Sequence, residues 1–128
     1  RTTCSYCGVG CQMELLVKGE KVIGVEPAKA SPNRGLLCVK GRFAYPFINH
    51  PDRLKTPLIK KDGQFQEATW EEAYKVIVDK MNGIKEEHGP EAFAGLTSAR
   101  CTNEENYLFQ KMFRAVIGTN NIDHCARL

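Results

Sequence analysis

The sequence lacks three features that would each assign it to a class of protein. No apolar run approaches the roughly 18 residues of a membrane-spanning helix, and the chain does not open on the charged, apolar and small-residue pattern of a secretory signal. Nor is there a basic segment, because 18 Lys and Arg and 15 Asp and Glu are spread along the chain for a net charge of +3. We therefore expect a cytoplasmic protein without a membrane span, and no nucleic-acid partner.

The cysteines of the sequence are arranged in an unusual way. The stretch CSYCGVGC places Cys4, Cys7 and Cys11 within eight residues, and Cys38 follows in LLCVKGR. The six cysteines could form three disulfides, but the first three are too close together for easy mutual bridging and no export signal is visible. The alternative is that the clustered thiolates hold metal.

The spacing of the cysteines is compatible with two kinds of metal site. A structural zinc site usually takes two close pairs of ligands, and Cys4 with Cys7 would make one pair, but Cys38 has no near partner. A 4Fe-4S cubane binds one thiolate at each of four corners, which suits three ligands on a tight loop and one from afar. Gly8 and Gly10 favour the cubane, because the backbone must wrap closely with its N–H groups facing sulfide.

Lys40 stands two positions after Cys38. A cluster with four thiolates is anionic, so a nearby ammonium group would stabilise its reduced form and raise its potential. The alternative for Lys40 is a solvated surface lysine.

The first 60 residues are predicted to form a small β-rich module. Residues 13–17 and 21–26 have the pattern of a hairpin that turns at Gly19. A second hairpin is predicted from residue 58 to residue 65, with its turn at Asp62-Gly63.

The rest of the chain has helical and buried-strand patterns. Capping boxes predict a helix over 70–87, begun by Thr69 and Glu72, and another from Thr102 and Glu105 to Gly118. The first helix is predicted to bury one face, made of Ala73, Val76, Ile77, Met81 and Ile84. Residues 92–96 are a short apolar run, typical of a strand buried on both faces. Since one such strand cannot make a parallel sheet, residues 61–128 are expected to be the beginning of a larger α/β domain.

Four stretches follow one another in a recognisable order: CSYCGVGC, NRGLLCVKGR, DRLKTPLIKKDGQFQEATWEEA and SARCTNEENYLFQKMFRAVIGTNNIDHCARL. In this order the chain resembles the molybdopterin-dependent formate dehydrogenases over essentially its whole length. The C-x2-C-x3-C-x26-C frame followed by Val-Lys-Gly is shared across the wider superfamily, nitrate reductases included, whereas the last stretch resembles the formate dehydrogenase branch. The resemblance implies an α+β / α/β fold, with a 4Fe-4S domain at 1–60 and the N-terminal part of the molybdopterin domain at 61–128.

The resemblance also implies roles for individual residues. It makes Lys40 the lysine between the cluster and one pterin, on the electron path. The implied ligands of the 4Fe-4S cluster are Cys4, Cys7, Cys11 and Cys38. The residues implied to face a bis-molybdopterin guanine dinucleotide cofactor are Arg100, Thr102, Asn103 and Glu104. Their loop follows the first α/β strand, where such folds bind ligands; the alternative is that Thr102 only caps a helix and Arg100 is solvated.

The other candidate residues lie near the end of the chain. Cys101 and Cys125 are expected to be small buried hydrophobic residues, and His124 is expected to be structural. In the family, the cysteine or selenocysteine that binds molybdenum or tungsten follows Ala-Arg-Leu directly, so the resemblance places this ligand just after Leu128 and no catalytic residue within the chain. We expect a UGA selenocysteine codon at position 129, and no activity from the 128 residues alone.

The implied function is the catalytic subunit of a formate dehydrogenase. It would interconvert formate and carbon dioxide at a molybdenum or tungsten centre and pass electrons through the cluster to iron–sulfur, diaphorase or hydrogenase subunits. The alternatives are a related nitrate reductase, a stand-alone iron–sulfur electron carrier and a zinc-stabilised binding module. Residues 65–128 would have no purpose in an electron carrier.

Overall fold

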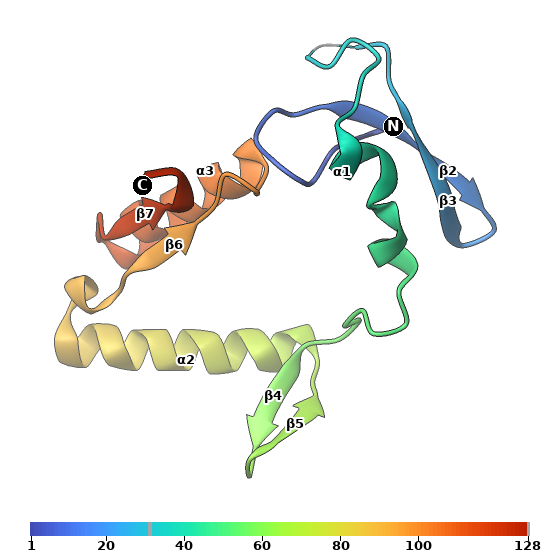
Figure 1. The fold of residues 1–128 in the computed structure, drawn as a ribbon. Helices are drawn as coiled ribbons and strands as arrows, with labels where there is room; N and C mark the ends of the chain where they lie inside the picture. Colours follow the sequence, from blue (N-terminus) through green and yellow to red (C-terminus); the bar gives the residue numbers. More distant parts are fainter. Residues whose placement is uncertain (31, 128) are drawn as a thin grey trace. The chain divides into compact units, whose positions relative to one another are not determined.

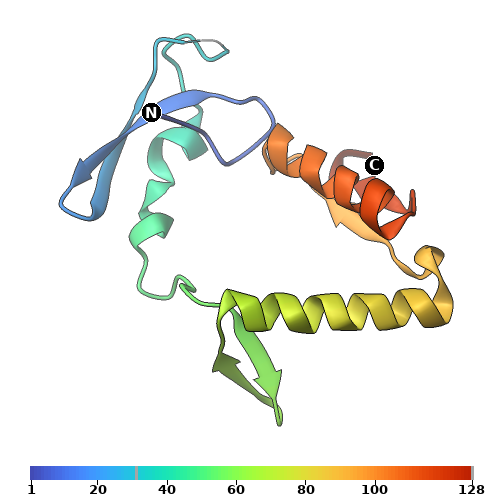
Figure 2. The same ribbon diagram turned by 180° about the vertical axis from the view of Figure 1, so that it is seen from behind.

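The computed structural model describes residues 1–30 and 32–127 and combines helices with strands (Figures 1 and 2). Two compact units make up the chain: one contains Arg1–Arg53 together with Ala94–Leu128, and the other contains Leu54–Phe93. Within the described residues, none of the helices has both the length and the apolarity needed to cross a membrane.

The N-terminal part of the first unit is a three-stranded antiparallel sheet. Its strands β1 (Thr2–Thr3), β2 (Gln12–Lys18) and β3 (Lys21–Pro27) lie in the order β1-β2-β3. The predicted first hairpin is confirmed, with Gly19 in its turn at a φ of 60°.

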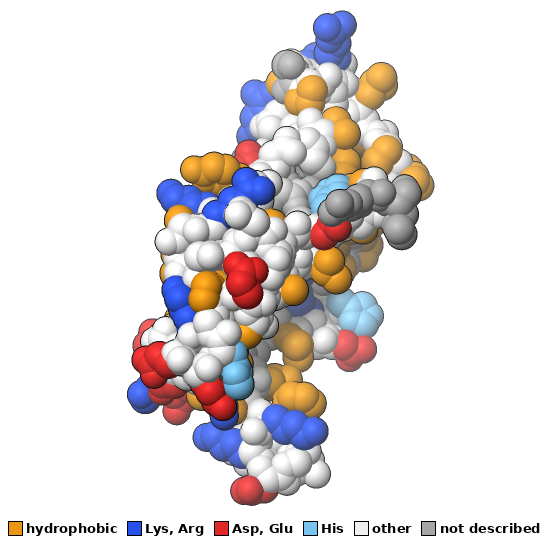
Figure 3. Space-filling model, turned by 90° about the vertical axis from the view of Figure 1, so that its left-hand side faces the viewer, with side chains coloured by type: hydrophobic (Ala, Val, Ile, Leu, Met, Phe, Trp, Pro, Cys, Tyr) orange, Lys and Arg blue, Asp and Glu red, His pale blue; other side chains and the backbone are white. Residues whose placement is uncertain are grey.

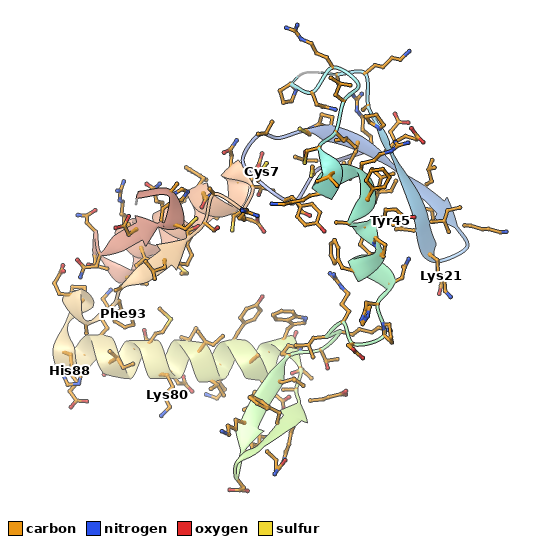
Figure 4. All side chains as sticks on the ribbon, viewed as in Figure 1. Cys7, Lys21, Tyr45, Lys80, His88 and Phe93 are labelled. Carbon is orange, nitrogen blue, oxygen red and sulfur yellow. The ribbon has the colours of Figure 1, made fainter. Side chains whose placement is uncertain are left out.

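A short helix that the sequence analysis did not anticipate follows the sheet. It comprises α1 (Val39–Phe43) and a 3-10 turn, η1 (Tyr45–Asn49). Side chains from both segments donate hydrogen bonds to carbonyls of β3: Arg42 to Val25 at 2.6 Å, Tyr45 to Ile23 at 2.9 Å, and Asn49 to Val22 at 2.7 Å. In Figure 4, the labelled Tyr45 accordingly points from this segment towards β3. These bonds fix α1, and therefore the cysteine that precedes it, against the sheet.

The core of this part forms between the sheet and the loops around it. Its buried members are Cys4, Met13 and Val25. Half-buried side chains packed against them include Cys11 and Leu37. Two of the predicted cluster ligands are thus part of the hydrophobic packing, so the loop that carries them is anchored to the fold.

The second unit consists of a hairpin and a long helix. Strands β4 (Leu58–Lys61) and β5 (Gln64–Glu67) form the predicted hairpin, with positive φ angles at Asp62 and Gly63 in its turn. Helix α2 (Trp70–His88) begins with the predicted capping box and is followed by a 3-10 turn, η2 (Pro90–Ala92).

The prediction that α2 buries one face is wrong for this unit. The helix has no buried residue, and Val76, Ile77 and Ile84 are 44%, 51% and 41% exposed. A hairpin and a 3-10 turn are the only other regular elements described between Leu54 and Phe93, and they offer too little surface to cover a helix of 19 residues. Lys80 and His88, labelled in Figure 4, follow Val76 and Ile84 by four residues each, so charged or polar side chains interrupt the predicted apolar face.

The C-terminal part of the first unit is a strand–helix–strand arrangement. It contains β6 (Gly95–Thr97), α3 (Asn103–Lys111), the π-helical η3 (Met112–Ile117), β7 (Ile122–His124) and the 3-10 turn η4 (Cys125–Arg127). The second capping box and the helix end at Gly118 are confirmed. Strands β6 and β7 pair in parallel, so the segment after Gly118 completes a two-stranded parallel ladder that the sequence analysis did not foresee.

Strand β6 is shorter and more exposed than predicted. It starts at Gly95, and Leu96 is 81% exposed, so the expectation of a strand buried on both faces is wrong for the described chain. Only one face of β6 is covered, because η3 and α3 lie on that side alone. A Cβ at Gly95 would lie 2.6 Å from the Phe113 ring and 2.9 Å from the Phe109 ring. Glycine therefore permits the close approach of helix and strand.

Charges of both signs are mixed on the surface. On the face drawn in Figure 3, Lys and Arg side chains lie among Asp and Glu side chains, with hydrophobic side chains between them. This distribution agrees with the small net charge of the sequence.

Candidate metal centre

The loop from Cys4 to Cys11 continues the pairing of β1 with β2. Thr3 is the register partner of Gln12, and one step further the N–H of Cys4 donates to the carbonyl of Cys11 at 2.8 Å. The sheet therefore closes the loop at its base and brings its first and last cysteines side by side.

Asn33 links this loop to the segment that carries Cys38. Its side chain accepts a hydrogen bond from the N–H of Gln12 at 2.7 Å and donates to the carbonyl of Leu36 at 2.8 Å. The loop before Cys38 is thereby held beside the start of β2, which is how a cysteine distant in sequence reaches the other three.

Cys38 is the residue immediately before α1, and it is exposed. The N–H groups of Gly41 and then Lys40 donate to its sulfur and lower the pKa of the thiol, and the positive charge of Lys40 adds to the effect. Gly41 also contacts Cys4, since a Cβ at Gly41 would lie 3.4 Å from the Cys4 sulfur. The start of α1 therefore contacts two predicted ligands, and the half-buried Lys40 influences the same site.

Cys11 shows that all four thiols share one electrostatic neighbourhood. Burial raises the pKa of Cys11, and negative charge on Cys4, Cys7 and Cys38 raises it further. Thiolates that repel one another in this way need a cation or a positively charged cluster core to be stable together.

The arrangement is not that of a preformed single-ion site. Nowhere in residues 1–30 and 32–127 are three His, Cys, Asp or Glu side chains gathered closely enough to hold one metal ion. Thiolates around one zinc would lie only about 3.8 Å apart, given Zn–S bonds of about 2.3 Å. A cubane binds each thiolate at a different iron and so spaces the sulfurs more widely. Four soft thiolate donors in one neighbourhood, each able to bind a different iron, fit a 4Fe-4S cluster.

The loop between β6 and α3, together with the first turn of α3, holds the four predicted cofactor residues. Thr102 is the cap of α3: its hydroxyl accepts from the N–H of Glu105 at 3.2 Å, and its own N–H donates to the Glu105 carboxylate at 2.7 Å. Thr102 therefore caps α3, as the capping box in the sequence predicted. Arg100 and Glu104 have exposed side chains, and the N–H of Arg100 donates to the Ser98 hydroxyl at 3.0 Å.

Asn103 connects this loop to the cysteine loop. Its side-chain amide donates a hydrogen bond of 2.7 Å to the carbonyl of Gly8, 95 positions away in sequence. In Figure 4 the labelled Cys7 correspondingly lies next to the start of α3. The predicted cluster loop and the predicted cofactor loop are therefore in contact.

The structure corrects the expectation for Cys125. This residue is exposed rather than buried, and its sulfur lies 3.3 Å from both the Ser98 hydroxyl and the Ala99 N–H. Hydrogen bonds from Ser98 and then Ala99, and the charge of Arg100, lower the pKa of its thiol. The reason is its place at the carboxyl end of β7, where the chain turns outward beside the end of β6.

Two further predictions concern residues near Cys125. Cys101 is half-buried rather than fully buried. His124 is half-buried, and its Nδ1 accepts a hydrogen bond from the Ala126 N–H at 3.1 Å, which is compatible with a structural role. The metal ligand placed after Leu128 lies outside the described residues.

A polar cavity of about 330 Å³ opens beside the two parallel strands. Its lining consists of Thr97, Asn106, Gln110, Arg114, Ile122, Asp123 and His124. Of these residues, His124 alone was considered from the sequence, as a structural residue. A signal was present in Asn106, Gln110 and Arg114, which recur at four-residue steps and so mark a polar stripe on one helical face.

Two family models of known proteins match successive parts of the chain. Residues 1–50 match the model of the molybdopterin oxidoreductase Fe4S4 domain, and residues 53–128 match that of the molybdopterin oxidoreductase family. A "Probable oxidoreductase" of Bacillus subtilis (strain 168), YjgC, is 48% identical over 128 residues, which is 99% of this chain and 13% of that protein. A "Putative formate dehydrogenase" of Staphylococcus aureus (strain USA300) is similar to the same extent. The chain thus spans 13% of the length of these curated relatives.

Proposed function

Because the chain belongs to the molybdopterin oxidoreductase family, we propose that it is the N-terminal part of the catalytic subunit of a formate dehydrogenase. The two family matches support a 4Fe-4S cluster and a molybdopterin cofactor. The single observation that carries the proposal is the convergence of four thiols within the region matched by the Fe4S4 model. The relative named for formate dehydrogenase favours formate as the substrate.

The reaction of the complete enzyme would convert formate into carbon dioxide, one proton and two electrons, or run in reverse. The molybdenum or tungsten centre supplies the two-electron chemistry when it is bound. Residues of this chain would hold the cluster that accepts the electrons and would form one wall of the pterin site. The proposed metal ligand, a cysteine or selenocysteine directly after Leu128, would come from the segment that follows.

The proposed ligands of the 4Fe-4S cluster are Cys4, Cys7, Cys11 and Cys38. Their support is the mutual effect of their charges and their placement by the sheet and by α1. We propose Lys40 as the electrostatic partner of the cluster on the electron path, since its charge already acts on the Cys38 thiol. The proposed cluster domain, residues 1–60, extends past residue 50, where the match to the Fe4S4 model ends, into the match that begins at residue 53.

The proposed cofactor-facing residues are Arg100, Thr102, Asn103 and Glu104. Their support is the position of their loop at the carboxyl end of β6, which pairs in parallel with β7, since ligands of α/β folds bind at this end. The capping bonds of Thr102 hold the loop in shape. The exposed side chains of Arg100 and Glu104 are then the ones available for the polar groups of a pterin dinucleotide.

The test is formate-dependent reduction of a dye by the complete enzyme. Activity with formate and none with nitrate is expected; the reverse would favour the related nitrate reductase. The purified 128 residues should show no formate oxidation, because the proposed metal ligand is not among them. Formate oxidation by this chain alone, free of contaminating enzyme, would show that the reaction does not need the metal ligand proposed to follow Leu128.

The partners and compartment belong to the same proposal. Electrons would pass to an iron–sulfur, diaphorase or hydrogenase subunit, and the enzyme would work in the cytoplasm, where thiols stay reduced and available to metal. Co-purification of such a subunit with the tagged complete enzyme would test the first point. Sequencing of codon 129 would distinguish UGA from a cysteine codon.

A further inference from the structure

The contact between Asn103 and Gly8 is tighter than a single hydrogen bond indicates. The Asn103 amide nitrogen lies 2.7 Å from the Gly8 carbonyl oxygen, and a Cβ built on Gly8 would meet the Asn103 amide oxygen, also at 2.7 Å. The φ of Gly8 is not positive, so its backbone conformation does not itself require glycine. An alanine at this position would therefore press on the Asn103 side chain and push it away from its bond to the Gly8 carbonyl.

The first turns of α3 contact two functional loops at once. Asn103 holds the cysteine loop through Gly8, while the side chain of Asn106 donates to the carbonyls of Ser98 and Thr102, both at 3.1 Å. The second set of bonds fixes the loop between β6 and α3. Two asparagines three residues apart on one helix therefore join the predicted cluster loop to the predicted cofactor loop.

The bond to Gly8 also orients the peptide next to the cluster ligands. In a trans peptide the C=O and the following N–H point in opposite directions. With the Gly8 carbonyl held towards α3, the N–H of Val9 is directed to the other side of the loop. Hydrogen bonds from backbone N–H groups to the cluster sulfurs are one of the means by which a protein sets a cluster potential.

We propose that Asn103 is a positioning residue that fixes the Cys7–Gly8 segment of the cluster loop against the first turn of α3. Its side chain serves the electron path between pterin and cluster by setting the place and orientation of this loop, a role additional to its proposed position beside the cofactor. The inference rests on the proposed function, because it assumes that the cysteine loop holds the 4Fe-4S cluster.

The test is a double-mutant cycle in the complete enzyme with Gly8→Ala, Asn103→Ala and both changes together. Each single variant should retain its iron, shift the midpoint potential of the cluster in an EPR-monitored titration, and slow cluster reduction by formate about tenfold or more, as small misplacements do. In the double variant the methyl group added at position 8 no longer meets the Asn103 amide, so Gly8→Ala should add little to the effect of Asn103→Ala. Asn103→Ser, which suits a helix start and is too short to reach Gly8, replaces Asn103→Ala if that variant loses its cluster.

Gly10→Ala is the matched control. Its φ of 77° strains an alanine, but nothing lies within 4 Å of a Cβ there. Its effect should therefore add fully to that of the Asn103 variant. Unchanged potential and reduction rate in the Asn103 variants, or full additivity of Gly8→Ala with them, would overturn the inference. A wild-type enzyme without a 4Fe-4S signal would instead overturn the proposed function beneath it, so the two failures are distinguishable.

Discussion

The N–H of Cys4 donates to the carbonyl of Cys11 at 2.8 Å, directly beyond the last paired residues of β1 and β2. A regular antiparallel ladder therefore ends in the loop that carries three of the four proposed ligands. This relationship makes the cysteine loop an extension of the sheet, and it explains how a small domain can present several thiols from one short segment. The fourth proposed ligand, Cys38, comes from a segment 27 positions further along the chain.

Replacement of Cys38 by serine should remove most of the bound cluster. The anaerobically reconstituted wild-type chain is expected to bind about four irons and four sulfides, one thiolate at each corner. The variant leaves one iron without its soft ligand, and iron and sulfide analysis with the visible absorption spectrum would measure the loss. Cys125→Ser is the matched control, because Cys125 is exposed and outside the proposed ligand set. Stoichiometric zinc without iron after anaerobic purification would contradict the prediction.

Lys40→Ala should lower the cluster potential and slow turnover in the complete enzyme while leaving the iron content unchanged. The reason is that removal of a positive charge destabilises the reduced, more anionic cluster. A redox titration, an iron determination and formate turnover would be compared with those of Lys29→Ala, whose exposed side chain lies just after β3 and outside α1. Loss of the cluster from Lys40→Ala would mean that Lys40 is needed for the cluster-binding segment to fold, and not for the electrostatic stabilisation of the reduced cluster.

Gly95→Ala should destabilise the C-terminal part of the first unit by about 1–3 kcal/mol, the usual cost of overpacking a close contact. The added Cβ would lie 2.6 Å from the Phe113 ring, so the helix must move away from β6. Gly83→Ala is the control, because nothing lies within 4 Å of its Cβ and alanine favours a helix interior by about 0.5–1 kcal/mol. Thermal unfolding of both variants would be compared, and equal melting temperatures would contradict the packing argument.

The start of α2 should weaken as the pH falls below the ordinary carboxyl range. The pKa of Glu72 is lowered because its carboxylate accepts the Thr69 N–H and the Thr69 hydroxyl, with a smaller contribution from Lys61. A carboxyl whose pKa is lower in the folded state stabilises the fold above its unfolded pKa, and this contribution is lost as the pH falls through the folded value. Denaturation followed by circular dichroism should show this pH dependence reduced in Glu72→Gln. An unchanged profile in that variant would mean that other carboxyls dominate.

Local signals in the sequence predicted the hairpin turns and the starts of the two longer helices, but not the short helix α1. Asp62-Gly63 predicted a hairpin turn, and Thr69 and Thr102 predicted two helix starts, because these residues act through bonds to near neighbours in the chain. Burial could not be predicted in the same way. Leu96 and the apolar face of α2 have the pattern of core residues, yet whether such residues are covered depends on which other elements pack against them.

Contacts between distant residues carry no local signal either. Nothing in the segments around Gly8 and Asn103 indicates that their atoms meet, since 95 positions separate them and the contact depends on how the two parts of the unit fold together. The exposure of Cys125 depends on the pairing of β6 with β7. Spacing predicted the four thiols as a set, but only the fold explains how Asn33 and Gly41 bring Cys38 to the others.

The most direct test of the central claim is freeze-quench EPR of the oxidised complete enzyme after mixing with formate. The account predicts that formate alone generates the signal of a reduced 4Fe-4S cluster, and that Cys38→Ser lacks this signal whether formate or dithionite is the reductant. A wild-type cluster that dithionite reduces but formate does not, with the molybdenum or tungsten cofactor shown to be present, would contradict the assignment of this chain to a formate dehydrogenase.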